Sequence, residues 1–318
     1  MKTLLTVTAI ILSIQLSAQF QWEMATNGIT EDLHDIEFVN DSTGIAYSYG
    51  TGNIYRTTDE GLHWEIITQT DSIFFEQIQM FKASGWICGE YGRILKTMDY
   101  GITWEDISIE SENKLLLYGM YFRGVMSGYV SGAEIIDNKS IPKTYVTYNG
   151  GNSWHEKLQG FPNMILNLAR KDDFLFASGS GFISKFHMIN NKTKHVFRDT
   201  LRVIGQIRDL KFANDDYGMA CSFNGYILTT IDGGESFTFK QITRNRLRSI
   251  VYLGEQEWLV AGDNNKNDAA VLYYTNDNWM SWQRNNEFPD IHRIHVTEKH
   301  IWIVGKKGLI AKTKRPDR

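Results

Sequence analysis

The sequence predicts an all-β fold: one seven-bladed β-propeller whose blades are four-stranded antiparallel sheets, closed by the N-terminal strand. A motif of the form Thr-x-Asp-x-Gly-x-Ser/Thr-Trp recurs at spacings of roughly 40 to 50 residues, the period range of propeller blades. Short stretches of alternating hydrophobicity, separated by turns rich in Gly, Asn and Asp, surround each copy. The last repeat has three predicted strands, and a matching fourth strand stands at the other end of the chain.

The recurring motif has the chemistry of a β-hairpin. An Asp or Asn side chain bonds its own backbone, and Gly accepts a positive φ without a Cβ clash. Three full copies span 57–64, 97–104 and 147–154, and two altered copies span 230–237 and 275–282. A metal-binding or catalytic role for these carboxylates would require five copies of one group around a ring. We therefore assign structural hairpin roles to Asp59, Gly61, Trp64, Asp99, Gly101, Trp104, Asn149, Gly151, Trp154, Asp232 and Gly234.

Composition and the first residues indicate an exported globular protein. The 318 residues are 42% apolar, and a net charge of -4 gives no general nucleic-acid footprint. Lys2, the apolar run 4–16 and the small pair Ser17-Ala18 predict a signal peptide over 1–18. The propeller then occupies 19–318, in the periplasm or secreted. No second apolar stretch approaches spanning length, so we expect no membrane insertion of the mature chain.

The blades can be followed in order. Blade one is predicted over 33–38, 45–48, 54–57 and 64–67, and blade two over 75–81, 85–88, 93–97 and 104–107. Blade three runs from 116 to 158, with 133–142 expected as a polar surface loop. Blade four lacks the Asp–Gly hairpin and uses an Asn-rich turn before an outer strand at 195–197. Blade five covers 207–242 and blade six 247–284.

Blade seven requires the N-terminus to complete it. Its predicted strands at 291–296, 301–304 and 309–313 are followed by no hairpin. The segment 20–24 resembles the outer strands that begin at Trp64 and Trp104. We expect it to pair beside 309–313 with Trp22 at the closure, which leaves no open blade edge. Cys88 and Cys221 then stand three blades apart, too far for a disulfide, and are expected to be buried free thiols.

The repeat resembles the Asp-box family, which sialidases and several propeller glycosidases share. With the third-strand pattern Gly-x-Ile, at Gly92-Arg93-Ile94, Gly225-Tyr226-Ile227 and Gly308-Leu309-Ile310, it is most similar to the photosystem II assembly and stability factor family of seven-bladed propellers. That resemblance covers nearly all of the mature chain and implies a propeller that binds a protein partner. The sialidase arginine motif is missing, because its nearest match, Phe122-Arg123-Gly124-Val125, lacks Ile-Pro and stands in blade three.

The candidate site is one mouth of the central channel. Aligned second positions of the innermost strands are His34, Glu76, Tyr118, Leu166, Arg208, Arg248 and His292. Guanidinium groups offer forked donors for a carboxylate or a phosphate. We expect partner or ligand binding by His34, Tyr118, Arg208, Arg248, His292 and Arg293. The alternative is that the arginines pair with Asp209, Glu76 or Asp35 and only solvate the channel.

Two classes of function follow from the sequence. The first is a monomeric, non-catalytic propeller that binds a protein partner as an assembly scaffold, with no catalytic residue, cofactor or metal. The second is a divergent glycosidase or lyase that uses Asp35, Glu76 and Asp209 at the channel mouth. A carbohydrate-binding module with exposed Trp279 or Trp86 is a further alternative, so a glycan ligand stays open.

Overall fold

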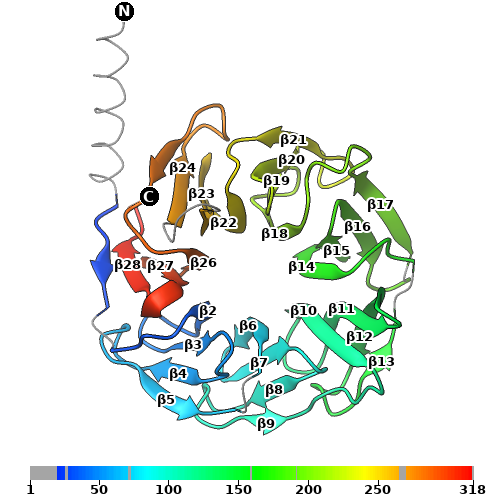
Figure 1. Cartoon of the computed structure of the whole chain (residues 1–318), viewed down its shortest axis with the longest axis horizontal. Helices are drawn as coiled ribbons and strands as arrows, with labels where there is room; N and C mark the ends of the chain where they lie inside the picture. Colours follow the sequence, from blue (N-terminus) through cyan, green and yellow to red (C-terminus); the bar gives the residue numbers. More distant parts are fainter. Residues whose placement is uncertain are drawn as a thin grey trace, which may run out of the picture.

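The computed structural model describes residues 20–25, 28–70, 73–157, 160–190, 192–264 and 270–316. Seven four-stranded antiparallel sheets stand as blades around a central channel (Figure 1). This confirms the predicted propeller. The leader expected over 1–18 lies outside the described residues.

The blades follow one another along the chain. Each begins with its innermost strand. Blade one consists of β2 (Leu33–Phe38), β3 (Gly44–Ser48), β4 (Ile54–Thr57) and β5 (Glu65–Thr68). Blade two consists of β6 (Phe75–Phe81), β7 (Ser84–Gly89), β8 (Ile94–Thr97) and β9 (Glu105–Asp106). Blade three consists of β10 (Lys114–Phe122), β11 (Gly128–Ile136), β12 (Lys139–Thr147) and β13 (His155–Glu156).

The remaining blades repeat this order. Blade four consists of β14 (Ile165–Lys171), β15 (Phe174–Gly179), β16 (Phe182–His187) and β17 (Thr193–Arg198). Blade five consists of β18 (Ile207–Phe212), β19 (Gly218–Ser222), β20 (Tyr226–Thr230) and β21 (Thr238–Gln241). Blade six consists of β22 (Arg246–Gly254), β23 (Glu257–Asp263), β24 (Ala270–Thr275) and β25 (Gln283–Asn285). Blade seven consists of β26 (Ile291–Val296), β27 (His300–Gly305), β28 (Ile310–Lys314) and β1 (Glu23–Met24), and a short 3-10 turn η1 (Lys306–Gly308) precedes β28.

The fourth strand of blade seven comes from the other end of the chain. Glu23 of β1 faces Lys312 and Met24 faces Ala311 of β28 in an antiparallel pair. The strand is short, and aromatic packing accompanies it. Phe20 is buried against Tyr274 of blade six at a ring-centroid distance of 5.3 Å. Trp22 is partly buried, with its ring 5.6 Å from that of Phe288.

The prediction of a polar surface loop over 133–142 is wrong. The strands β11 and β12 continue through this insertion with unbroken pairing from Gly128↔Thr147 to Ile136↔Lys139. Asp137 and Asn138 form the turn with φ of 49° and 59°, the backbone that a tight two-residue hairpin requires. The structure therefore has a longer hairpin at this place, which the polar composition concealed.

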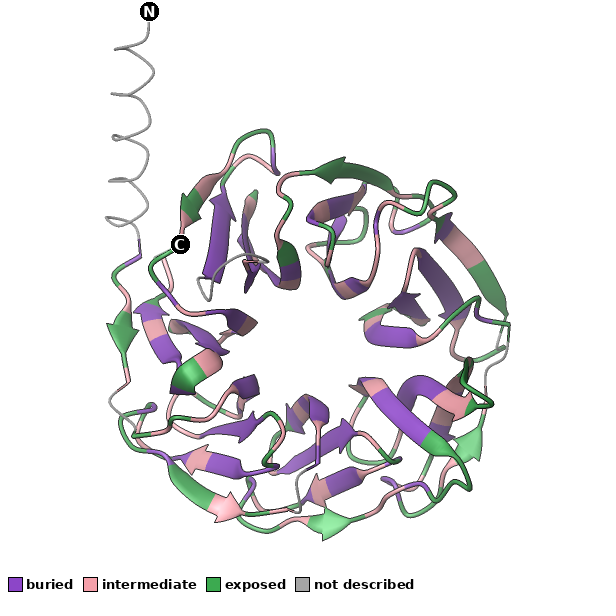
Figure 2. Ribbon diagram, in the orientation of Figure 1, coloured by how far each residue is buried: buried purple, intermediate pink, exposed green. Residues whose placement is uncertain are grey.

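The inner strands are mostly buried and the outer rim is mostly exposed (Figure 2). Buried apolar side chains of neighbouring blades pack together in clusters. One cluster joins Phe38 and Trp64 of blade one to Trp302 of blade seven. Cys88 and Cys221 are buried free thiols in β7 and β19, as predicted. Within the described ranges, no helix has the length and hydropathy needed to cross a bilayer.

The Asp-box hairpins are held by their own side chains. In blade two the Thr97 hydroxyl donates to Asp99 Oδ1 at 2.8 Å and accepts from the Gly101 N–H at 3.0 Å. Asp99 also accepts from the backbone N–H of Thr103 at 2.9 Å. The same two bonds of the threonine hydroxyl recur in the hairpins that begin at Thr57, Thr147, Thr230 and Thr275, where the acceptor after Thr147 is the amide oxygen of Asn149 and the other acceptors are aspartates.

The box glycines also permit close packing between blades. Gly101 has a φ of 78°, and a Cβ added there would lie 2.2 Å from Ile45 Cδ1 of blade one. Gly61 meets Trp302 of blade seven and Gly234 meets Phe176 of blade four in the same manner. Glycine is thus required for the turn and for the contact with the preceding blade.

Candidate functional site

A β-bulge in every blade creates the channel mouth. Each innermost strand pairs with the second strand in a register that omits one residue, which aims that side chain out of the ladder. The omitted residues are the seven aligned positions named from the sequence: His34, Glu76, Tyr118, Leu166, Arg208, Arg248 and His292. The sequence alignment placed these residues together, but it did not show that bulges present them.

Three arginines and two aromatic rings form one arc of this mouth. The guanidinium carbons of Arg208, Arg246 and Arg248 lie 5.1, 5.7 and 5.1 Å from the centre of the Phe223 ring. Arg208 also stands 5.9 Å from the Tyr118 ring. Phe223 and Arg246 were not predicted from the sequence. Their signals were an aromatic residue in the turn after β19 and an arginine at the first position of β22.

Two carboxylates neutralise part of this charge. Arg208 Nη2 lies 3.4 Å from Glu76 Oε2, an ion pair that joins blades five and two across the channel. Arg248 Nη2 lies 2.6 Å from Asp263 Oδ2 within blade six. Arg246 is exposed. Of the expected pairings, Arg208 with Glu76 is present, whereas Arg248 pairs with Asp263, a partner that the sequence did not suggest.

The pKa of Arg208 reports the balance of charge at the mouth. Burial lowers this pKa most, Glu76 raises it, and Arg248 and Arg293 lower it further, so that the net shift is downward. An arginine stays charged at neutral pH even so. The three arginines of the arc face two carboxylates, Glu76 and Asp263, so their positive charge is incompletely compensated and an added anion would be bound favourably there.

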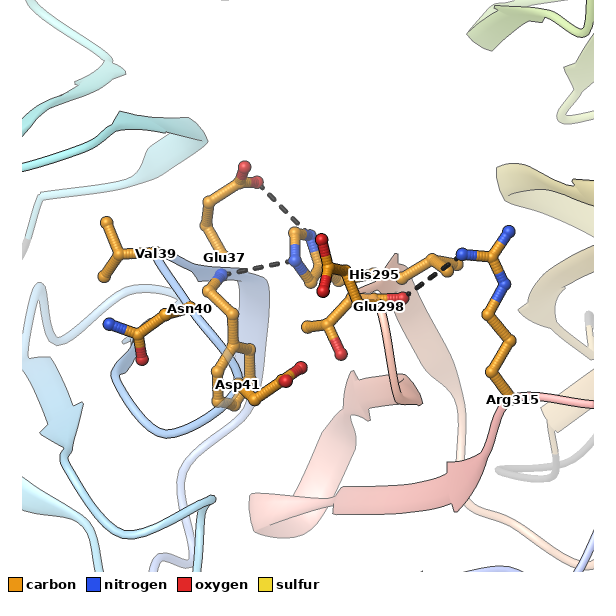
Figure 3. Close-up of a pocket in the computed structure, with 10 residues that line it drawn as sticks. Glu37, Val39, Asn40, Asp41, His295, Glu298 and Arg315 are labelled. Atoms are coloured by element: carbon orange, nitrogen blue, oxygen red, sulfur yellow. Dashed lines mark hydrogen bonds and ion pairs between the residues drawn. The ribbon is translucent and has the colours of Figure 1, made fainter. Parts of the chain in front are cut away.

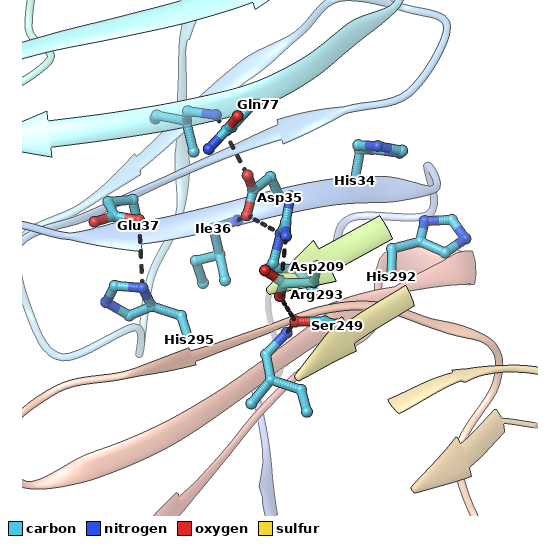
Figure 4. Close-up of polar contacts among 12 residues, drawn as sticks. His34, Asp35, Ile36, Glu37, Gln77, Asp209, Ser249, His292, Arg293 and His295 are labelled. Carbon is cyan, nitrogen blue, oxygen red and sulfur yellow. Dashed lines mark hydrogen bonds and ion pairs between the residues drawn. The ribbon is translucent and has the colours of Figure 1, made fainter. Parts of the chain in front are cut away.

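The two histidines stand side by side at the mouth. Their ring centres are 5.6 Å apart (Figure 4). His34 Nε2 lies 3.4 Å from Glu76, and His292 Nδ1 lies 2.9 Å from the Leu33 carbonyl oxygen, to which it donates. Burial, followed by the nearby His34 and Arg248, lowers the pKa of His292 well below its usual value. His292 is therefore a neutral channel liner at neutral pH.

Arg293 was expected at the mouth, but its side chain lies outside the arc. Its Nε lies 2.9 Å from Asp35 Oδ1 and its Nη1 3.6 Å from Asp209 Oδ2, one residue beyond the bulge (Figure 4). The two carboxylates hold the guanidinium inside the channel wall and raise the pKa of Arg293 despite burial. Its role is to join blades five, seven and one.

The carboxylates proposed for a glycan-active enzyme are used by the fold. Asp35 accepts from the backbone N–H of Ile78 in blade two at 3.3 Å, and Asp209 from that of Ile250 in blade six at 3.1 Å. Glu76 is engaged by His34 and Arg208. In the part of the chain that the structure describes, His, Cys, Asp and Glu side chains form no group of three suited to a metal ion.

The prediction that Trp279 or Trp86 is exposed and could bind a carbohydrate is wrong. Trp86 is fully buried and stacks on Phe122 at a centroid distance of 3.7 Å, and Trp279 is 4% exposed. Both rings fill space between strands and cannot offer a face to a sugar.

A second hollow, of about 600 Å³, lies between blades one and seven toward the other end of the channel (Figure 3). Its polar groups pair with one another. His295 Nε2 accepts from the Phe38 N–H at 3.3 Å, and His295 Nδ1 faces Glu37 at 3.4 Å. Lys299 bonds Asp41 at 3.1 Å. This internal pairing makes the hollow a weaker candidate than the mouth.

Comparison with known proteins places the chain in a family. Residues 14–205, more than half of the sequence, match the family described as photosynthesis system II assembly factor YCF48. The photosystem II assembly lipoprotein Ycf48 of Synechococcus sp. (strain CC9902) is 25% identical over 152 residues. That match covers 46% of this chain and 43% of the relative, so the chain spans less than half the length of this curated relative.

Solved structures agree on the fold. The structure of YCF48 bound to D1 peptide has a TM-score of 0.73 at 19% identity, covering 93% of this chain and 97% of the other. YCF48 from Cyanidioschyzon merolae has a TM-score of 0.70 at 16% identity, covering 92% and 98%. The RRP9 WD40 repeats reach 0.72 at 10% identity, covering 93% and 97%, so the likeness of shape alone does not separate functions. The sequence match decides the matter: this chain is a member of the photosynthesis system II assembly factor YCF48 family.

Proposed function

We propose that this protein is an exported, non-catalytic propeller that binds a protein partner at its channel mouth and acts in the assembly of a protein complex. The observation that carries the proposal is the arc of Arg208, Arg246 and Arg248 around Phe223. A structure of a family relative holds a D1 peptide, and a curated relative is named an assembly lipoprotein. Both support a peptide or protein as the ligand of this chain.

The arc selects its ligand by charge and by shape. A guanidinium group donates two parallel hydrogen bonds to a carboxylate, and Arg is enriched among residues that dominate binding energy at interfaces. The aromatic rings hold the arginines in place, which reduces the entropy lost on binding. We infer that the partner presents an acidic side chain or a terminal carboxylate on an exposed segment.

Affinity capture from the native envelope and medium tests the proposal. Arg246→Glu reverses an exposed charge at the mouth, whereas Arg284→Glu makes the same change on the outer strand β25 of the same blade. We expect Arg246→Glu to lose the partner and Arg284→Glu to retain it. Equal recovery of the partner by both variants would exclude the mouth as the binding surface.

A second, conservative variant distinguishes loss of binding from loss of folding. Arg248→Lys keeps the charge beside Asp263 but removes the planar fork and weakens the contact with Phe223. We expect weaker capture with an unchanged melting temperature. Undiminished capture would show that forked recognition by Arg248 is not used.

A further inference from the structure

The end of the ring opposite the channel mouth carries most of the exposed apolar side chains. We call this end the hairpin face: it is formed by the turns between first and second strands and by the hairpins between third and fourth strands. In each of blades one to six a backbone bond joins these two loops, as from the Tyr100 N–H to the Ala83 oxygen at 2.8 Å. Of the nineteen large apolar residues exposed in the described chain, eleven stand there: Leu62, Phe81, Met98, Tyr100, Ile102, Val125, Met126, Tyr148, Ile189, Ile231 and Met280.

These residues are densest on blades two and three. Met98 and Ile102 of one hairpin are 56% and 53% exposed, and Met126 on the adjoining turn is 55% exposed. The two blades are contiguous here, because a Cβ placed on Gly150 of blade three would lie 3.1 Å from Lys96 Nζ of blade two. The result is one apolar patch on turn tips, beyond what scattered surface residues would give.

Positive charge coincides with the patch. Lys82 and Arg123 are exposed on the turns after β6 and β10, and Lys96 stands between the two hairpins. Arg56 donates from Nε to the Tyr100 carbonyl oxygen at 2.9 Å, and Glu65 of β5 stands opposite it in the strand pair. The corresponding turns of blades five and six are acidic instead, with exposed Asp215, Asp216 and Glu255. In blade four, Lys171 pairs with Asp172 at 2.7 Å and Arg170 stands beside it, so that turn has no net negative charge.

We propose that the hairpin face of blades two and three docks on an anionic lipid surface. Apolar side chains at turn tips enter the headgroup boundary, while lysine and arginine beside them attract acidic lipids. The segregation of charge on this face orients the ring, because the acidic turns of blades five and six are repelled by the same surface. The carboxylate within the patch, Asp99, is satisfied by four donors of its own hairpin, which reduces the cost of its desolvation.

Flotation of the purified protein with vesicles tests this. We expect it to float with vesicles of equal parts phosphatidylcholine and phosphatidylglycerol, and to remain unbound with phosphatidylcholine alone. Lys82→Gln and Arg123→Gln should each weaken binding by about fivefold, the value of one cation near an anionic surface. Ile102→Asn with Met126→Asn should weaken it as well. The matched control is Ile231→Asn with Met280→Asn, on the same face but in the acidic sector, which should float as the unmodified protein does.

A labelled cysteine gives a second readout that does not depend on affinity. Because Cys88 and Cys221 are buried, a cysteine placed by Ile102→Cys can be labelled selectively with an environment-sensitive dye. We expect a blue shift on addition of anionic vesicles, and none from Ile231→Cys. Absence of binding to anionic vesicles, equal losses in the control variant, or capture of a protein through these residues without vesicle binding would each overturn the proposal.

Discussion

The side chain of Asp99 shows at the residue scale how a carboxylate shapes a hairpin. It accepts bonds from the Thr97 hydroxyl and from the N–H and hydroxyl of Thr103. Partial burial opposes the effect, but these donors lower the pKa of Asp99 to about 2. The pKa values of Asp59 and Asp232 are also about 2, through their bonds to His63 and Ser236. The role is structural in each case.

A dependence of stability on pH follows. The folded pKa lies below the unfolded value of about 3.9, so the stabilisation is present above that pH and is lost as the pH falls toward 2. Asp99→Asn keeps an acceptor oxygen, as Asn149 does in blade three, but loses the charge. We expect the urea midpoint of the variant to fall less between pH 5 and pH 2 than that of the unmodified protein, measured by fluorescence. Equal slopes would contradict the assignment.

Gly101 carries a second residue-scale prediction. Gly101→Ala forces a Cβ into the left-handed region and against Ile45, which should destabilise the fold by about 2–5 kcal/mol. Gly124→Ala is the control, because nothing lies within 4 Å of a Cβ at that position. Thermal unfolding should separate the two variants clearly. A Gly101→Ala melting temperature equal to that of Gly124→Ala would show that the blade contact is loose.

At the scale of the element, the N-terminal segment supports the last blade. Phe20 is buried between blades six and seven, whereas Trp22 is only partly covered. Phe20→Ala should therefore cost about 3–5 kcal/mol, and Trp22→Ala less. Met24→Ala is a suitable control, since Met24 is 56% exposed. Chemical denaturation that ranks the three in another order would show that the segment does not pack in this way.

The elements differ in how far sequence could predict them. Repetition of the Asp box gave the strand order and number, because each copy repeats the same hairpin bonds. The pairing partner of β1 was deduced from the three-stranded last repeat. The insertion in blade three was mistaken for a loop, because its strands have little apolar content and are stabilised by pairing within the blade. Phe20 was overlooked beside Trp22, because burial depends on the side chains of blade six.

At the scale of the whole molecule, the bulges in the seven innermost strands bring one side chain from each blade to the channel mouth. Equivalent positions of the innermost strands could be aligned from sequence, which placed Arg208 and Arg248 near each other. The depth of Arg293 could not be predicted, because it depends on contacts with Asp35 and Asp209 in blades far apart along the chain. The contribution of Phe223 could not be predicted either, because it stands in a turn outside the aligned strand positions. Family membership adds the expectation of a protein ligand, and we propose that this ligand binds at the arginine arc.

Site-specific photo-cross-linking in the cells that naturally make the protein tests the central claim most directly. Tyr91 is exposed on the turn between β7 and β8 at the mouth, and Ile231 is exposed on the hairpin face in the acidic sector. A photoreactive residue at position 91 should yield an adduct with a protein partner, and Arg246→Glu should abolish that adduct. An adduct only from position 231, or one from position 91 that persists in Arg246→Glu, would contradict binding at the arginine arc.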